Sequence, residues 1–284
     1  MKKLMVAMSA ALMLTACGNE TELSGRLQTP NDSIENVTIE FVIPMTTSTQ
    51  AMTRGELSAS QMTDLWLFDY VGDELQQTIH QSSADTGFGS VAINTTTGNH
   101  TFCFVASRGT EPTVSGSTIT WAKPSDTFWK AVAMSVTPTT ATAQPVVLDR
   151  AATRLKVSIT DEVPTTLASL SITTATWHSG INAKTGQPTT ASARTSTINV
   201  PTSYQGTTGQ LSVSIFCIAG DDFNTDVSIT AMDGNSQQIA TVSVDDVTMK
   251  RNITTQLSGP LFTRQPVFGL NLAEDWGEDI DINW

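Results

Sequence analysis

Short segments in which apolar and polar residues alternate recur along this chain, and turn residues separate them at intervals of about eight to twelve positions. In one such segment Val37, Ile39, Phe41 and Ile43 fall on the same face of an extended strand. Long stretches with the apolar period of a helix are missing from the sequence. Threonine takes about one position in six, and Thr and Val fit a pleated sheet better than a helix. The sequence therefore predicts an all-β protein of the sandwich type.

The charge balance and the missing motifs exclude several classes of function. The chain has 27 Asp and Glu against 15 Lys and Arg, a formal charge of −12, so we expect no nucleic-acid partner. It has no phosphate-binding glycine loop and no Gly-x-Ser-x-Gly element, and His80, His100 and His178 do not lie at metal-ligand spacing. We therefore expect a protein that is not an enzyme and that has no catalytic residues, no metal and no cofactor.

The first 17 residues have the pattern of a bacterial lipoprotein signal. Lys2 and Lys3 precede an apolar run of about eleven residues, which is shorter than the roughly 20 residues that a membrane-spanning helix needs. Leu14-Thr15-Ala16-Cys17 follows directly, and it places small residues before a cysteine that would carry lipid. We predict a signal peptide at 1–16 and lipidation of Cys17. The alternative is an ordinary signal peptide with a chance cysteine at this spacing.

The remaining chain is predicted to contain a flexible tether and two β-sandwich domains. Residues 17–36 are mostly polar, which is typical of a tether. A Thr- and Pro-rich run ends near Asp149, and a new alternating pattern begins after Arg150. We therefore expect an N-terminal domain at 37–149 and a C-terminal domain at 150–284. Cys103 and Cys217 lie in apolar strand-like segments, one in each half, and are expected to be buried thiols; a disulfide would have to join the two halves.

Several local sequence phrases, taken in their order along the chain, resemble the fimbrillin superfamily of Bacteroidales type V pili. None of them is specific alone, but as a set they extend over nearly all of the chain after Cys17. They are Thr53-Arg54; Asp64-Leu65-Trp66-Leu67-Phe68-Asp69 followed by Gly72; Leu148-Asp149-Arg150-Ala151-Ala152-Thr153-Arg154-Leu155; Met249-Lys250-Arg251-Asn252; Ser258-Gly259-Pro260-Leu261-Phe262; and Trp276-Gly277-Glu278-Asp279-Ile280-Asp281-Ile282.

This resemblance implies two tandem transthyretin-like Greek-key β-sandwich domains and export as a lipoprotein to the outer membrane, facing the cell surface. It implies a structural fimbrial subunit, closest to the anchor branch, that assembles with other fimbrial subunits by β-strand addition. In stalk subunits of this superfamily, an arginine-specific protease removes the first strand, and Arg54 occupies the comparable place here. The candidate strand-exchange residues are Val37, Ile39, Phe41 and Ile43 at one end of the chain, and Ile280, Ile282 and Trp284 at the other.

Two other functions stay open at the level of sequence. A surface lipoprotein could bind a glycan through exposed tryptophans, with Trp121 and Trp177 as the candidates. A tip adhesin would bind a ligand on a host or bacterial surface through a long loop, and residues 183–209 are the candidate segment.

Overall fold

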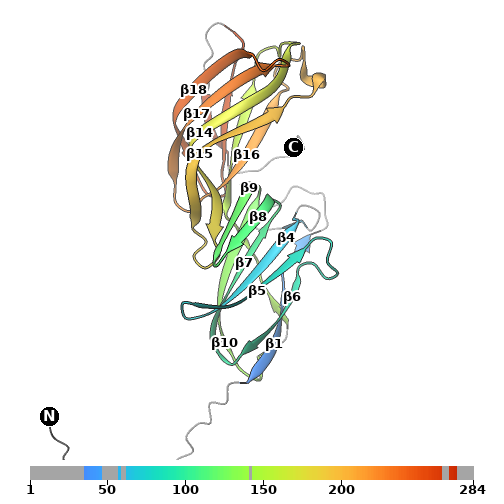
Figure 1. Ribbon diagram of the computed structural model, residues 1–284, viewed down its shortest axis with the longest axis vertical. Coiled ribbons are helices and arrows are strands. Elements are labelled where there is room, and N and C mark those ends of the chain that lie inside the picture. Colours follow the sequence, from blue (N-terminus) through green and yellow to red (C-terminus); the bar gives the residue numbers. More distant parts are fainter. Residues whose placement is uncertain (1–34, 47–56, 59–61, 141–142, 264–268, 274–284) are drawn as a thin grey trace, which may run out of the picture. The chain divides into compact units, whose positions relative to one another are not determined.

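The computed structural model describes residues 35–46, 57–58, 62–140, 143–263 and 269–273, and most of these lie in β-strands (Figure 1). The one helical segment in this part of the chain is a single 3₁₀ turn at Thr202–Tyr204. The prediction of an all-β protein is therefore confirmed. A helix with the length and apolar character needed to cross a membrane is not found among the described residues.

The first β-sandwich consists of a three-stranded sheet packed against a five-stranded sheet. The three-stranded sheet has the order β11 (Ala143–Pro145), β1 (Asn36–Val42), β6 (Ser90–Thr96). The five-stranded sheet has the order β12 (Asp149–Arg150), β10 (Thr127–Val136), β7 (Gly98–Ser107), β4 (Asp64–Val71), β5 (Glu74–Ser82). Within this sandwich the chain crosses from one sheet to the other after β1, β5, β6, β10 and β11, as in a Greek-key arrangement.

Strands β4 and β5 form a hairpin near residue 70. Its turn contains Gly72, whose φ of 58° is a left-handed value that glycine adopts without steric cost. Strand β4 is buried on both faces, which explains why Leu65 to Phe68 are all apolar instead of alternating with polar residues. A short parallel pair, β2 (Met45–Thr46) and β3 (Leu57–Ser58), lies apart from both large sheets in the hydrogen-bonding pattern.

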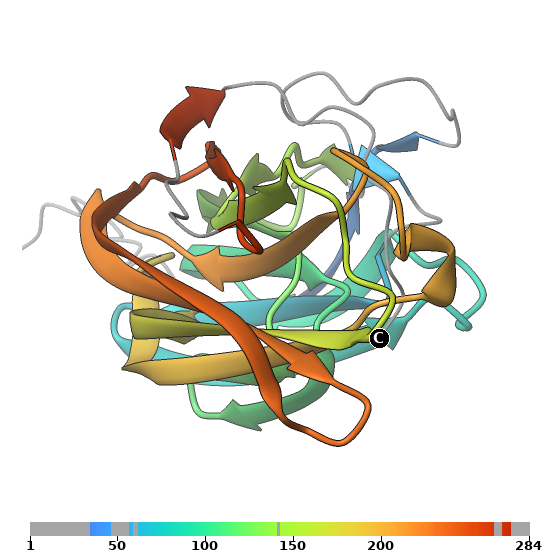
Figure 2. The same cartoon turned by 90° about the horizontal axis from the view of Figure 1, so that it is seen from above.

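The second β-sandwich also has two sheets. The four-stranded sheet has the order β16 (Ser212–Ile218), β13 (Ala152–Ile159), β19 (Thr254–Gly259), β20 (Gly269–Ala273). The six-stranded sheet has the order β18 (Gln238–Met249), β17 (Phe223–Asp233), β14 (Leu167–Asn182), β9 (Thr118–Lys123), β8 (Thr110–Ser115), and β15 (Pro188–Asn199) pairs with β14. Figure 2 shows the hairpin of β17 and β18 in orange. Residues 183–209, the candidate adhesin loop, are therefore largely strand β15 and the turns beside it.

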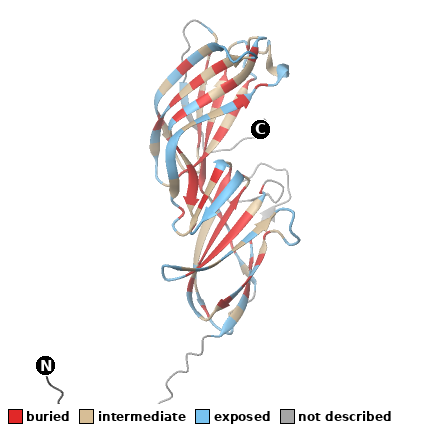
Figure 3. Ribbon diagram, viewed as in Figure 1, coloured by how far each residue is buried: buried red, intermediate tan, exposed pale blue. Residues whose placement is uncertain are grey.

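Three apolar clusters form the interior, as the alternating buried and exposed bands along the strands indicate (Figure 3). One fills the first sandwich and one fills the second. The third joins residues of β4, β7 and β9 to Ala151, Ile181, Ala183 and Ile218. Strand β9 also pairs with the end of β14, so a hairpin from the first half of the sequence extends a sheet of the second half. The exact residue that divides the two domains stays a prediction.

Candidate strand-exchange site

The first described strand is the middle strand of its sheet. Strand β1 pairs antiparallel with β6 from Asn36, opposite Thr96, to Val42, opposite Ser90. On its other side it pairs parallel with β11, where Glu40 lies opposite Ala143. The edge of β1 that faces β6 is therefore paired along the whole strand and the edge that faces β11 is paired from Glu40 to Val42, so loss of β1 would open two strand edges at once.

The inward face of β1 is the one that the sequence predicts. Ile39, Phe41 and Ile43 are buried and Val37 is half-buried, while the residues between them are exposed. The Phe41 ring lies 4.8 Å from that of Phe102, measured between ring centroids, and packs against the five-stranded sheet. Burial of each large apolar side chain contributes about 2 kcal/mol, so the strand is held firmly by its side chains as well as by its ladder.

Backbone hydrogen bonds continue the β1 ladder at its C-terminal end. The Ile43 N–H donates to the Gly89 carbonyl over 2.8 Å, and the Val146 N–H donates to the Val42 carbonyl over 2.9 Å. The first bond faces β6 and the second faces the segment after β11. The groups of β1 are thus paired on both sides to the end of the strand.

A buried polar cluster fastens β6 to the opposite sheet. The Thr95 hydroxyl donates to Asp69 Oδ2 over 2.6 Å, and His100 Nδ1 lies 2.7 Å from Asp69 Oδ1. The side chains of Asp69 and His100 are 0% and 1% exposed, so each needs its partner, because water does not reach them. The His100 ring also stacks on Phe102. Sequence reasoning missed this cluster, since its members are 26 and 31 residues from Asp69 and belong to no spacing motif.

Most of the other predicted site residues lie outside the described part of the chain. These are Cys17, Arg54, Ile280, Ile282 and Trp284. Lipidation, proteolytic processing and C-terminal strand exchange therefore stay predictions. The last described strand, β20, occupies the edge of its sheet and pairs with β19 from Gly269 to Ala273.

The two tryptophans considered for glycan binding are not on the surface. Trp121 and Trp177 are each 1% exposed. The indole N–H of Trp177 donates to the Phe216 carbonyl over 2.9 Å, and the Trp121 ring packs edge-on against Trp66. The prediction of an exposed aromatic surface is wrong for these two residues, because both fill apolar clusters.

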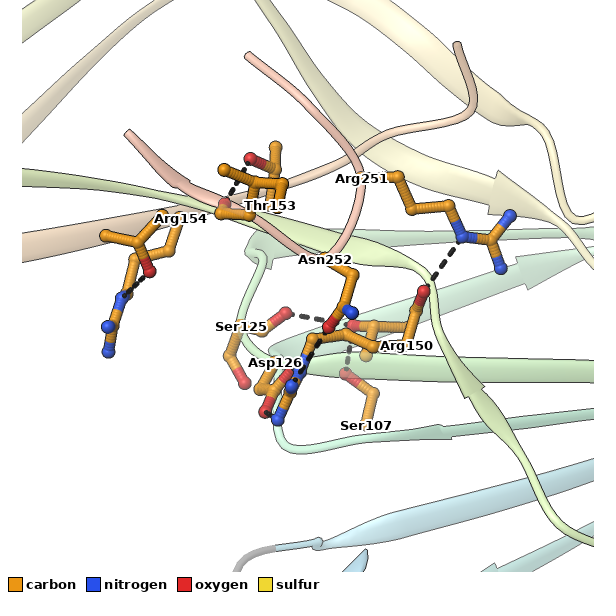
Figure 4. A network of polar contacts seen from close by, with 11 residues as sticks. Ser107, Ser125, Asp126, Arg150, Thr153, Arg154, Arg251 and Asn252 are labelled. Carbon is orange, nitrogen blue, oxygen red and sulfur yellow. Dashed lines mark hydrogen bonds and ion pairs between the residues drawn. The ribbon is translucent and has the colours of Figure 1, made fainter. Parts of the chain in front are cut away.

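Two of the sequence phrases noted above meet in a polar network (Figure 4). The Arg150 guanidinium binds Asp126 through Nε and Nη2, at 2.8 and 3.0 Å, and donates through Nη1 to Asn252. Nε of Arg251 donates to the Arg150 carbonyl over 2.8 Å. An arginine guanidinium can donate two parallel hydrogen bonds to one carboxylate. The pair therefore fixes the orientation of the Arg150 and Asp126 side chains as well as the distance between them.

The described residues offer little for metal or thiol chemistry. Groups of three or more side chains able to hold a metal ion are not found among them. Cys103 and Cys217 are free and buried, and burial raises the pKa of each thiol to about 12. Such thiols are protonated and unreactive near neutral pH.

Comparison with known proteins places the chain in a family. A model of a family of unknown function, DUF6562, matches residues 113–284. The chain belongs to this family. The DUF6562 match begins inside β8, so it includes most of the β8–β9 hairpin together with the whole second sandwich. No match was found among curated proteins.

Solved structures share the fold at low sequence identity. A candidate polysaccharide-binding protein (DUF1812) from Bacteroides thetaiotaomicron covers 82% of this chain and 97% of its own, with 8% identity and a TM-score of 0.51. A candidate adhesin from the same species covers 83% of this chain and 95% of its own, with 7% identity and a TM-score of 0.51. The fimbrial anchor protein Mfa2 from Porphyromonas gingivalis covers 83% and 96%, with 9% identity and a TM-score of 0.47. The first two of these structures and the sheets described above confirm the β-sandwich fold that the fimbrillin resemblance implies.

Proposed function

We propose that this protein is a lipid-anchored structural subunit of a type V fimbria that attaches the pilus to the outer membrane. In this proposal Cys17 carries the lipid, the β-sandwiches face the cell surface, and other fimbrial subunits bind by β-strand addition. The protein performs no catalysis. The fold it shares with a candidate adhesin from Bacteroides thetaiotaomicron agrees with this role, and the sequence phrases described above suggested it.

The observation that carries the proposal is the place of β1. The first described strand after the lipidation signal is a middle strand whose side chains Ile39 and Phe41 are fully buried. Retention of β1 therefore links the sandwich to the residues that precede it, and through them to Cys17. Its removal would leave an apolar slot between β6 and β11, which an incoming strand could fill with ladder bonds and alternate side chains.

The anchor role follows from an intact Arg54. If the chain is not cut there, β1 keeps its slot and the lipid stays attached to the sandwich. The subunit then cannot accept a partner strand at this slot, so a growing polymer would end here. A chain cut at Arg54 would instead release β1 with the lipid and behave as a stalk subunit.

Mass spectrometry of the protein isolated from the cell surface tests this choice. We expect a mature chain that begins at an acylated Cys17 and contains Arg54 within one polypeptide. A mature form that begins at Gly55 and carries no lipid would overturn the anchor role. Purification of the native complex after solubilisation of the outer membrane should recover fimbrial subunits, and a Cys17→Ala variant should release them from the membrane fraction.

A further inference from the structure

Strands β1 and β11, near the two ends of the first sandwich in the sequence, are parallel neighbours. Phe41 lies opposite Gln144 and Val42 lies opposite Pro145. The chain enters the sandwich at the start of β1, and β11 is followed only by the short strand β12 before β13 begins. Because β1 and β11 are parallel, the start of β1 and the end of β11 lie at opposite ends of one hydrogen-bonded strand pair.

We propose that the β1 ladder is a mechanical clamp, which resists extraction of β1 when the chain is pulled from its N-terminus. A pull between the start of β1 and the end of β11 acts along the strands, so it loads all the ladder bonds of β1 together. A pull applied at one end of a strand pair opens the bonds one at a time. The source of the force rests on the proposed function, since a lipid on Cys17 would hold the N-terminus while the pilus pulls on the body.

Side chains add to this resistance. To slide along its own axis, β1 would have to draw the Phe41 ring past Phe102 and Phe104, whose centroids lie 4.8 and 5.0 Å away. The interior is close-packed, so this movement is not possible without loss of those contacts. Glu40 is also hydrogen-bonded to Ser90 on the outer face of the same sheet.

The neighbouring strand is itself held in place. Thr95 of β6 is bonded to Asp69 of β4, and the Gln81 side chain of β5 donates to the Ser90 carbonyl over 2.7 Å. These bonds join β6 to the five-stranded sheet by routes that do not include β1. Strand β6 can therefore stay with the body of the sandwich while β1 is under load, which a clamp requires.

Single-molecule pulling with two attachment geometries tests the proposal. The mature chain is made without acylation, and DNA handles are attached to Cys17 and to one introduced cysteine. With Val147→Cys, an exposed position just after β11, the load on β1 is in shear. Asn99 is exposed and lies two residues after Thr97, whose N–H donates to the Glu35 carbonyl just before β1. With Asn99→Cys, the same strand is therefore unzipped from its start. The native Cys103 and Cys217 are buried and do not compete for the handles.

We expect the first unfolding force in the Val147 geometry to be at least about twice that in the Asn99 geometry at one loading rate, because forced unfolding follows the unfolding barrier along the pulled direction. Equal forces, or a lower force in the Val147 geometry, would overturn the proposal. Phe41→Leu should lower the unfolding force in the Val147 geometry and leave the fold intact. Val42→Ala, at the adjacent exposed position, should leave both the force and the fold unchanged. An unchanged force in Phe41→Leu would also count against the clamp.

This measurement is independent of the cellular role. It contains no membrane and no pilus, so a failure to find acylated Cys17 in cells would leave its result unaffected. Conversely, a weak β1 ladder would not contradict attachment through lipid.

Discussion

Nη1 of Arg150 donates a hydrogen bond of 3.1 Å to Oδ1 of Asn252, which lies 102 residues further along the chain. Arg150 belongs to β12, at the edge of the first sandwich, and Asn252 lies between β18 and β19 of the second. Asn252 has a φ of 58°, a left-handed value that Asn tolerates better than most residues. The bond therefore connects the two sandwiches. In the second sandwich it is made at a turn, and Asn at position 252 suits the left-handed backbone conformation of that turn.

Replacement of Arg150 should weaken the contact between the two sandwiches and lower the free energy of unfolding. Its side chain is 8% exposed and that of Asp126 is 13% exposed, so Arg150→Ala would leave a largely buried carboxylate without its main partner. We expect a loss of about 3 kcal/mol in the free energy of unfolding, measured by urea denaturation. Arg150→Lys should recover only part of it, because an ammonium group cannot bind Asp126 and Asn252 in the same fork.

The pair Lys130 and Asp149 provides a control on the same strands. Its two side chains are 41% and 61% exposed, although the N–O distance is also 2.8 Å. Lys130→Ala should change the free energy of unfolding by less than about 1 kcal/mol, because exposed ion pairs contribute little. Equal effects of Arg150→Ala and Lys130→Ala would contradict the importance given to burial of the Arg150 network.

The Thr95 side chain should stabilise the fold mainly through the hydrogen bond of its hydroxyl group, and less through its volume. Thr95→Val keeps the shape of the side chain but removes the donor to Asp69, whose carboxylate is fully buried. We expect a loss of about 1–3 kcal/mol in the free energy of unfolding. Thr95→Ser keeps the donor, so it should retain most of the stability. Urea denaturation of both variants would decide, and a larger loss in Thr95→Ser would show that the methyl group dominates.

The turn between β14 and β15 should not tolerate a side chain at Gly186. A Cβ atom there would lie 2.6 Å from the Trp129 ring, and the φ of 69° is itself unfavourable for other residues. Gly206 has a similar φ of 73°, but a Cβ atom added to it would meet nothing within 4 Å. Gly206→Ala should therefore cost about 1 kcal/mol, from backbone strain alone. Gly186→Ala should cost more, and the difference between their thermal unfolding midpoints would measure the contact with Trp129.

The buried Cys217 should make stability fall in alkaline solution. Burial raises the pKa of its thiol to about 12, whereas a thiol in the unfolded chain titrates near 8.5. Below about pH 8 the Cys217 thiol keeps its proton in both the folded and the unfolded state, so its full contribution to the free energy of unfolding is present. Above that pH the unfolded state loses protons that the folded state retains, and the free energy of unfolding falls by up to about 1.4 kcal/mol per pH unit.

Denaturation of the wild type and Cys217→Ala between about pH 8 and 10.5, under reducing conditions, checks this expectation. The wild type should lose stability more steeply than the variant. Parallel slopes would mean that the Cys217 thiol is accessible to solvent. Tyr70, whose pKa burial also raises, is present in both proteins and affects both slopes equally.

The alternating segments predicted much of the fold. The buried face of β1, the hairpin at Gly72 and the two-sandwich architecture all follow from local periodicity and turn chemistry, because these act over a few neighbouring residues. Residues 183–209, considered from the sequence as a long loop, contain strand β15 instead. The Thr- and Ser-rich strand β15 is an edge strand, where polar residues can face water along much of its length.

The features that the sequence did not reveal depend on long-range pairing. Tryptophan is a residue type that binding surfaces use, but Trp121 and Trp177 are buried. Their burial depends on how separate strands pack together, which local sequence does not specify. The meeting of Asp69 with His100, and of Arg150 with Asn252, likewise requires knowledge of which strands are neighbours. Residue spacing carries no information about such pairs unless they lie on one element.

The pairing of β9 with β14 has a practical consequence for anyone who wishes to produce the C-terminal half by itself. A recombinant fragment that starts at Arg150 would lack the hairpin from Thr110 to Lys123, leaving Gly180 to Asn182 without their neighbours on that side. We would expect such a fragment to aggregate through this unpaired strand edge. Beginning it at Arg108 instead would supply the missing ribbon from within the same polypeptide.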